Sequence, residues 1–245
     1  MNADKKEEAS AGLDRASIRV QPRSSAVVHS ILLIVVTVVL IWSGIFPRDR
    51  FTWYLEVAPG VIGIVILAIC YRRFRFTTLV YTLVALHACL LFVGGHYTYA
   101  EVPAFNWLRD HFHLSRNHFD RLGHFMQGFA PAMLAREVLI RKSPLARSRW
   151  LGFLVFCICM TISAIYEEFE WITAVLSGSS ADAFLGGQGD PWDTNKDMAM
   201  CFIGSLASLI WLSKGQDRQL LGIPFMRDTS DADLPPESSL DHHRS

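Results

Sequence analysis

The stretch from Ala26 to Phe46 reads AVVHSILLIVVTVVLIWSGIF and decides the class of fold. A helix needs about 20 mostly apolar residues to cross the hydrocarbon core of a bilayer, and here the only interruption by an ionisable side chain is His29. The run is longer than the apolar region of a typical signal peptide and lacks a good small-residue cleavage site. We therefore expect it to remain in the protein as a membrane anchor.

The rest of the chain contains further apolar runs, in line with a hydrophobic content of 51% and a mean hydropathy of +0.26. They predict an all-α fold, a polytopic membrane helix bundle of about six transmembrane helices. The most polar candidate begins at Asp120, and an amphipathic helix of a soluble protein would look similar. We expect a span because neighbouring helices can shield polar groups from lipid. The predicted spans are Ala26–Phe46, Val57–Tyr71, Thr77–Gly95, Asp120–Ile140, Trp150–Leu176 and Met198–Ser213.

The basic residues predict the orientation of these spans. An even number of spans puts both termini on one side, and most of the 23 Lys and Arg residues fall in segments on that side. Because cytoplasmic segments are enriched in Lys and Arg, both termini are predicted to be cytoplasmic. The predicted domains are a disordered N-terminus at 1–25, a six-helix transmembrane domain at 26–213 and a largely disordered tail at 214–245.

Charge and cysteine usage exclude two classes of function. The net charge is zero, with 23 basic and 23 acidic residues, so no overall positive field predicts a nucleic acid partner. The five cysteines lie inside or at the end of apolar runs, where they are expected to act as small buried hydrophobic residues. The sequence thus predicts neither a disulfide framework nor a CxxC redox site.

The predicted topology brings ionisable side chains to the outer end of four spans. Residues three or four apart share one face of a helix, so each span presents its polar groups together. Charges inside a membrane are costly, and a functional site is the first hypothesis where several converge. The pairs that argue for a site are Asp120 with His124, Glu167 with Glu170, and Asp193 with Asp197, and the third span ends nearby at His96.

Carboxylates gathered in one place favour a bound cation, since they otherwise repel one another. Oxygen ligands with one or two imidazoles suit a divalent metal such as Mg²⁺, Mn²⁺, Ca²⁺ or Zn²⁺. Glu167 and Glu170 are also candidate catalytic groups, together with His96 as a proton carrier. The candidate metal ligands are Asp120, His124, Glu167, Glu170, Asp193 and Asp197.

The segment GGQGDPWDTNKDM, from Gly186 to Met198, has two further interpretations. If a helix starts by about Pro191, then Asp190 is a helix cap and Asp193 interacts with the helix dipole. The segment fails as an EF-hand loop because position 6 is Met198 and position 12 is Gly204, where Gly and Glu are needed.

Three motifs carry a resemblance to a known family. They are NHFDRLGHFM from Asn117, YEEFEW from Tyr166 and FLGGQGDPWDTNKDM from Phe184. In this order they resemble the uncharacterised bacterial inner-membrane proteins of the YjdF type, over most of the chain from the first span to the sixth. The resemblance implies a multi-pass protein of the bacterial inner membrane and no assigned reaction. A short element from Asp120 to Phe125 is also similar to the D-K-x-x-H-F pattern of VanZ-like membrane proteins, with Arg121 in place of Lys.

Three functions remain open from the sequence. The first is a metal-dependent enzyme acting at the outer face on a lipid head group, a lipid-linked envelope precursor or another small molecule. The second is a cation- or proton-coupled transporter that uses the carboxylates as its ion site. The third is a non-catalytic membrane assembly or stress protein, in which salt bridges among Asp120, Arg121, Glu167 and His124 hold the bundle together.

Overall fold

The computed structural model describes residues 23–178 and 182–221. These residues form helices and no strands, and all lie within one compact unit, Gln21–Gly222. The predicted disordered ends lie outside the described residues, apart from residues 23–25, which are helical in α2, and 214–221, of which all but the last are helical in α9. The long helices are α2 (Arg23–Ser43), α3 (Arg50–Cys70), α4 (Thr78–Tyr97), α6 (Phe119–Lys142), α7 (Trp150–Ser177) and α9 (Asp193–Leu220).

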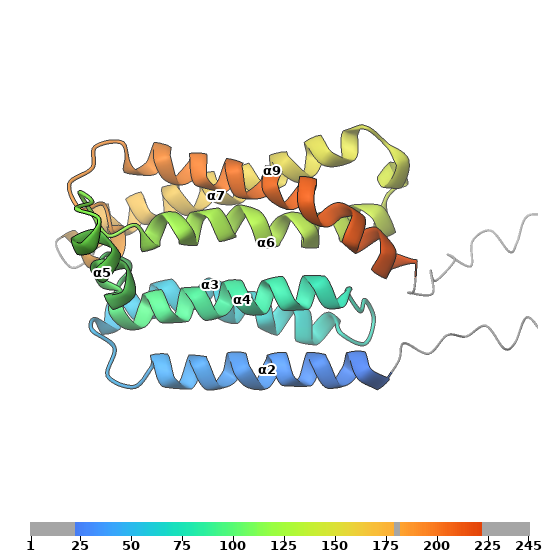
Figure 1. Cartoon of the computed structure of the whole chain (residues 1–245), viewed down its shortest axis with the longest axis horizontal. Coiled ribbons are helices and arrows are strands. Elements are labelled where there is room, and N and C mark those ends of the chain that lie inside the picture. Colours follow the sequence, from blue (N-terminus) through green and yellow to red (C-terminus); the bar gives the residue numbers. More distant parts are fainter. Residues whose placement is uncertain (1–22, 179–181, 222–245) are drawn as a thin grey trace, which may run out of the picture. The chain divides into compact units, whose positions relative to one another are not determined.

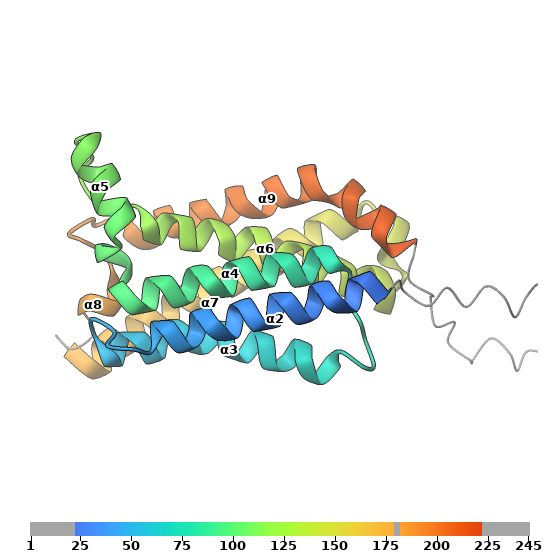
Figure 2. The ribbon, with the colours of Figure 1, turned by 60° about the horizontal axis from the view of Figure 1, so that its bottom comes forward.

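Successive long helices run in opposite directions and form two groups, with α2, α3 and α4 in one and α6, α7 and α9 in the other (Figure 1). The groups meet mainly through α4 and α6. The loops before α3, α6 and α9 gather at one end of the bundle, which we call the α5 end because α5 (Pro103–His111) lies there (Figures 1 and 2). The start of α2 and the end of α9 lie at the opposite end. Three short elements complete the described chain: α8 (Asp182–Leu185) and the 3₁₀ turns η1 (Tyr99–Glu101) and η2 (Pro144–Arg147).

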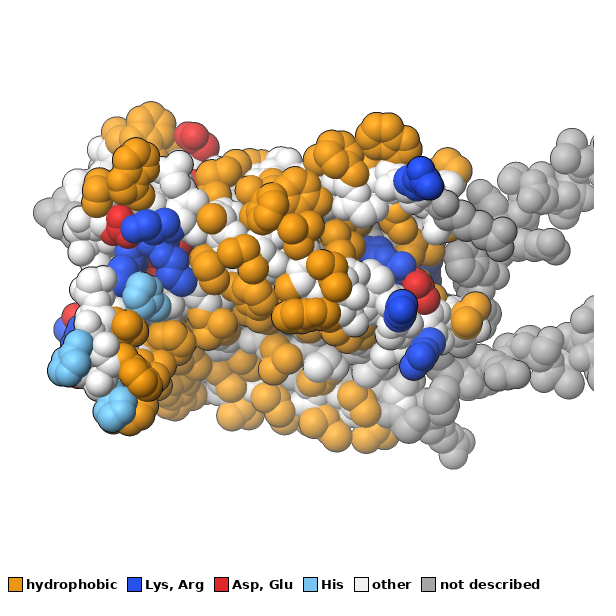
Figure 3. All heavy atoms as spheres, turned by 45° about the horizontal axis from the view of Figure 1, so that its top comes forward, with side chains coloured by type: hydrophobic (Ala, Val, Ile, Leu, Met, Phe, Trp, Pro, Cys, Tyr) orange, Lys and Arg blue, Asp and Glu red, His pale blue; other side chains and the backbone are white. Residues whose placement is uncertain are grey.

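Five of the long helices, α2, α3, α4, α7 and α9, are long and apolar enough to cross a membrane. The sixth, α6, is long enough but more polar, and it packs against α4, α7 and α9. On the face drawn in Figure 3, hydrophobic side chains cover the middle of the molecule and charged side chains gather toward the two ends. The predicted membrane helix bundle is confirmed, and its polar helix is sheltered by the others as expected.

Two helices begin earlier than the apolar runs suggested. Helix α3 starts at Arg50, and the side chain of Asp49 accepts a hydrogen bond of 2.6 Å from the backbone N–H of Thr52. Helix α9 starts at Asp193 and continues to Leu220, past the predicted boundary at 213. Its first and last turns are therefore polar segments attached to an apolar centre.

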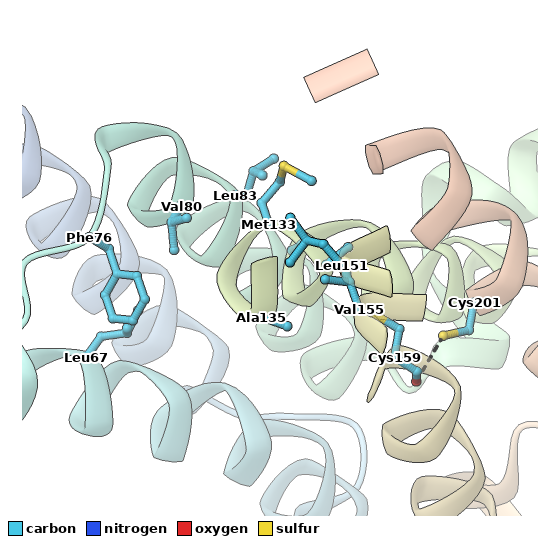
Figure 4. Packing of buried hydrophobic residues seen from close by; sticks show 12 residues of the cluster. Leu67, Phe76, Val80, Leu83, Met133, Ala135, Leu151, Val155, Cys159 and Cys201 are labelled. Carbon is cyan, nitrogen blue, oxygen red and sulfur yellow. Dashed lines mark hydrogen bonds between the residues drawn. The ribbon is translucent and has the colours of Figure 1, made fainter. Parts of the chain in front are cut away.

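Helices α6 and α9 cross in close contact at two glycines. A Cβ atom built on Gly204 would lie 2.0 Å from the backbone oxygen of Phe125, and one built on Gly128 would lie 2.0 Å from that of Cys201. Hydrophobic residues of α3, α4, α6 and α7 fill the neighbouring core, where the thiol of Cys201 donates to the backbone oxygen of Cys159 at 3.5 Å (Figure 4). Small residues at such a crossing let two backbones touch.

A buried polar network ties the helices together at the opposite end. Glu137 of α6 is fully buried and accepts hydrogen bonds from the backbone N–H of Thr77 at 3.0 Å and from Arg141 at 2.8 Å. Gln216 of α9 donates to the backbone oxygen of Met133 at 2.7 Å. These bonds join the start of α4 to α6 and the end of α9.

Candidate functional site

Three buried side chains meet at the α5 end of the bundle. Asp120 and His124 lie one turn apart on α6, and Asp197 faces them from the first turns of α9. Their exposed fractions are 5%, 4% and 2%, and one potential ligand atom from each lies within 4.8 Å of the others. We call Asp120, His124 and Asp197 the Asp–His–Asp group. His124 Nε2 is 3.4 Å from Asp120 Oδ1 and 3.9 Å from Asp197 Oδ1.

Helix α7 adds two glutamates beside this group. Glu167 Oε1 lies 3.7 Å from His124 Nδ1 and, although buried, has no hydrogen-bond partner among the described residues. His124 Nδ1 is also 3.1 Å from Gln127 Oε1, one turn further along α6. Glu170 is partly buried and close enough to interact electrostatically with His124 and Asp120. Both ring nitrogens of His124 thus lie beside oxygen atoms that can accept a hydrogen bond.

Two arginines, Arg116 and Arg121, occupy the outer side of the group, and we call them the arginine pair. Arg121 forms ion pairs with Asp197 and, at 2.5 Å, with Asp193. Arg116 forms an ion pair with Asp193 and lies 3.6 Å from Asp120 Oδ2. Both guanidinium groups are nearly buried, so these contacts are shielded from water. The arginine pair joins the start of α6 to the start of α9.

The glycine-rich loop before α9 wraps around the arginine pair. Its backbone turns through positive φ at Gly186 (61°) and Gly189 (81°), which places the Gly186 oxygen 3.0 Å from Arg116 Nη2. Asp190 lies ahead of the helix, where it accepts from the backbone N–H of Trp192 at 3.0 Å and from Lys196 at 2.7 Å. The hydrogen bond from Lys196 holds the pKa of the Asp190 carboxyl below its ordinary value.

The structure brings four of the predicted ligand residues close together and places the other two outside this set. Asp120, His124, Asp197 and Glu167 lie together, and Glu170 lies near them. In contrast, Asp193 is held by the arginine pair. Asp190 does not occupy the predicted cap position, because α9 begins at Asp193, with Trp192 as its N-cap residue, rather than near Pro191.

His96, the predicted proton carrier, makes its contacts with α2 and its own helix. Its Nδ1 lies 3.0 Å from the backbone oxygen of Ser43, and its ring stacks on Trp42 with a centroid distance of 4.4 Å. These contacts join the end of α4 to the end of α2. They give His96 a packing role between these helices, and its part in proton transfer stays a prediction.

Sequence reasoning missed one acidic side chain at the site. Glu56 of α3 is 1% exposed and accepts a hydrogen bond of 3.5 Å from the hydroxyl of Tyr166 on α7. It also interacts electrostatically with Asp120 and His124. The available signal was the presence of a single acidic residue, Glu56, in the otherwise apolar segment from Phe51 to Cys70.

The fold and the site define a class: a multi-pass helical membrane protein with a buried carboxylate, histidine and arginine cluster at one end of its bundle. Residues 28–218 match the family described as "Predicted membrane protein (DUF2238)", and the chain belongs to this family. The chain is 46% identical over 184 residues to the inner membrane protein YjdF of Escherichia coli (strain K12), covering 75% of this chain and 88% of that relative. No solved structure matches it. The chain is thus a multi-pass protein of the bacterial inner membrane, as the motifs predicted.

Proposed function

We propose that the protein is a metal-dependent membrane enzyme that acts on a lipid head group or a lipid-linked envelope precursor at the outer face. The observation that carries this proposal is the Asp–His–Asp group, in which three buried ligand atoms lie within 4.8 Å of one another. Three protein ligands with a position left for water or substrate are typical of catalytic metal sites. The positive-inside rule supports an extracytoplasmic position for the α5 end.

The ligand set suits a divalent ion. If His124 binds through Nε2, its Nδ1 hydrogen can be donated to Gln127 Oε1 at 3.1 Å, the kind of contact that orients metal-binding histidines. A carboxylate offers two oxygens, so the ion pair between Asp197 and Arg121 leaves one oxygen for a metal.

The charges around the site favour a cation as well. Carboxylates outnumber basic side chains in the cluster, and a divalent ion would offset the excess. The carboxylates are Glu56, Asp120, Glu167, Glu170, Asp190, Asp193 and Asp197, and the basic side chains are Arg116, Arg121 and Lys196.

The chemistry follows from the positions of these groups. A bound divalent metal would supply a Lewis acid for a phosphoryl or acyl oxygen and lower the pKa of a coordinated water. Glu167, with its unpaired Oε1 beside the imidazole, can accept a proton from such a water. The arginine pair sits at the outer rim, where guanidinium groups suit a phosphate oxygen.

Metal analysis of the purified protein tests the proposal. After incubation with Mn²⁺ or Zn²⁺ and dialysis, we expect about one divalent ion per chain in the wild type. Asp197→Asn should lose the ion. Asp217→Asn is the matched control, because Asp217 lies on the same helix at the opposite end and is 53% exposed. His124→Gln provides a second variant if the first does not fold. The proposal is contradicted if the folded wild type and the folded site variants hold equal amounts of metal, or if the wild type holds none.

A structural role is the second candidate, and the arginine pair favours it. Buried ion pairs that connect α6 to α9 can hold a bundle in one arrangement without any reaction. In that case Asp197→Asn and Arg121→Gln would both reduce the amount of folded protein in the membrane. Normal abundance together with lost metal binding supports the enzyme instead.

A further inference from the structure

A cavity of about 250 Å³ lies directly beside the candidate site, toward the middle of the bundle. Its walls come from α3, α4, α6, α7 and the η1 turn. His124 belongs to both the Asp–His–Asp group and the cavity wall, so a molecule in the cavity lies next to the proposed metal ligands. Along α3 the lining runs from Pro59 to Leu67, a rise of about 12 Å at 1.5 Å per residue.

The polarity of the lining changes along this length. Tyr99, His124 and Tyr166 line the part at the α5 end, and Leu67 and Leu134 line the part farthest from it. Two further polar residues, His87 of α4 and Gln127 of α6, line the stretch between them. A molecule that fits both parts has a polar head and an apolar tail. In the proposed orientation, the head would face the outer surface and the tail would point toward the bilayer centre, as in a lipid of the outer leaflet.

Two residues that line the cavity, Pro59 of α3 and Ile162 of α7, are exposed on the surface of the bundle. The exposed fraction of Ile162 is 40%. Tyr166 of α7 meets Glu56 of α3 at the site end, but elsewhere these two helices make few contacts with each other. A lipid chain can therefore enter between α3 and α7 without passing through water.

We propose that this cavity binds an acyl chain of a membrane phospholipid and so presents the lipid head group to the Asp–His–Asp group. The inference rests on the proposed function for the chemistry at its polar end, and it names the substrate class as a glycerophospholipid. Binding of the chain itself depends only on the cavity and on entry between α3 and α7.

Helix α6 provides a selective readout for this binding. From Phe119 to Ile140 its side chains are buried or only partly exposed, so bulk lipid has little access to them. Gln127, Ala130 and Leu134 line the cavity from this helix. A photoreactive acyl chain that labels these α6 residues must have entered the cavity.

One glycine allows the cavity to be filled with little disturbance. A Cβ atom on Gly63 of α3 meets nothing within 4 Å, and Gly63 lines the cavity. Gly63→Leu should therefore occupy the space of the chain while favouring the helix. Gly152→Leu on α7 is the matched control, because a Cβ there also meets nothing within 4 Å and Gly152 lies outside the lining.

The experiment reconstitutes the full chain in nanodiscs containing a phospholipid with a diazirine on its acyl chain, irradiates it and maps the labelled peptides. We expect label on α6 in the wild type and in Gly152→Leu, and loss of that label in Gly63→Leu. A parallel sample with a diazirine free fatty acid separates the two sources of an acyl chain. Label from the fatty acid alone, no label on α6, or full label in folded Gly63→Leu would overturn the proposal.

Metal content measured on the same samples separates this inference from the proposed function. If α6 is labelled but no metal is bound, the result supports the lipid site and contradicts the proposed metal enzyme. If metal is bound but α6 is not labelled, the result supports the metal site and contradicts lipid binding in the cavity. Because the labelling needs no turnover, it also works after chelation of the metal.

Discussion

The contact between α6 and α9 makes a testable prediction about Gly204. An added methyl group in Gly204→Ala would lie 2.0 Å from the backbone oxygen of Phe125 and 3.2 Å from the backbone nitrogen of Phe129. Both obstacles are backbone atoms, which cannot turn aside as a side chain could. The two helices must therefore move apart along their closest crossing.

The magnitude follows from two opposing effects. Overpacking of a tight contact costs about 1–3 kcal/mol, and a rigid backbone obstacle belongs at the upper end of that range. Replacing Gly by Ala inside a helix stabilises the folded state by about 1 kcal/mol. We expect Gly204→Ala to lower the free energy of unfolding by about 2 kcal/mol. Gly215→Ala on the same helix, where a Cβ meets nothing within 4 Å, should leave stability unchanged or slightly raise it.

A double-mutant cycle tests whether the two glycines share one crossing. A Cβ on Gly128 would lie 2.0 Å from the backbone oxygen of Cys201, so Gly128→Ala should destabilise the protein similarly. Once one methyl group has separated the helices, the second meets less resistance, and the double variant should lose less than the sum of the single losses by about 1 kcal/mol or more. Unfolding in mixed detergent micelles gives all four values. Strict additivity, or a Gly204→Ala variant as stable as Gly215→Ala, refutes the reasoning.

Two further predictions concern the ends of the bundle. Glu137→Gln should lower the free energy of unfolding by about 1–3 kcal/mol because it breaks the ion pair between the fully buried Glu137 and the partly buried Arg141. Glu168→Gln, at an exposed position, should have little effect in the same assay. Burial and the nearby arginine pair hold the pKa of His118 below its ordinary value of 6.5, so the unfolded chain takes up the proton first as pH falls. Stability should therefore decline below about pH 6.5, and His118→Gln should remove that part of the decline. Unfolding curves between about pH 7.5 and about pH 5 test this pH dependence, with a substitution of the exposed His111, His111→Gln, as the control. Identical pH dependence in the wild type and in His118→Gln would contradict the prediction.

The membrane spans were predictable because the bilayer imposes a length and a polarity on each helix separately. The polar α6 was predicted as a sixth span because neighbouring helices can shield its polar groups, and the structure shows it as a long helix packed against α4, α7 and α9. The helix starts were less predictable. At α3 and α9 the polar first turns resemble loops, and their helical state depends on the cap at Asp49 and on the contacts of Asp193 with the arginine pair.

The composition of the site was predictable only in part. Spacing along single helices correctly paired Asp120 with His124, because both lie on α6. Partners from different helices depend on how the helices rotate and pack, which no spacing records. Nothing in the spacing indicates that Asp193 pairs with two arginines. The lone acidic residue in the apolar segment marks Glu56 as unusual, but only the packing of α3 shows that it reaches the cluster.

The central position of α6 has a consequence for how the protein is made. Ionisable side chains within a membrane are costly, and α6 carries them near both of its ends, from Asp120 to His124 and from Arg136 to Lys142. Its most extensive partner is α9, which leaves the ribosome last among the long helices. We therefore expect the polar helix to be fully sheltered only when the final span arrives, so a chain cut before α9 would hold an incompletely sheltered segment that quality-control proteases can recognise.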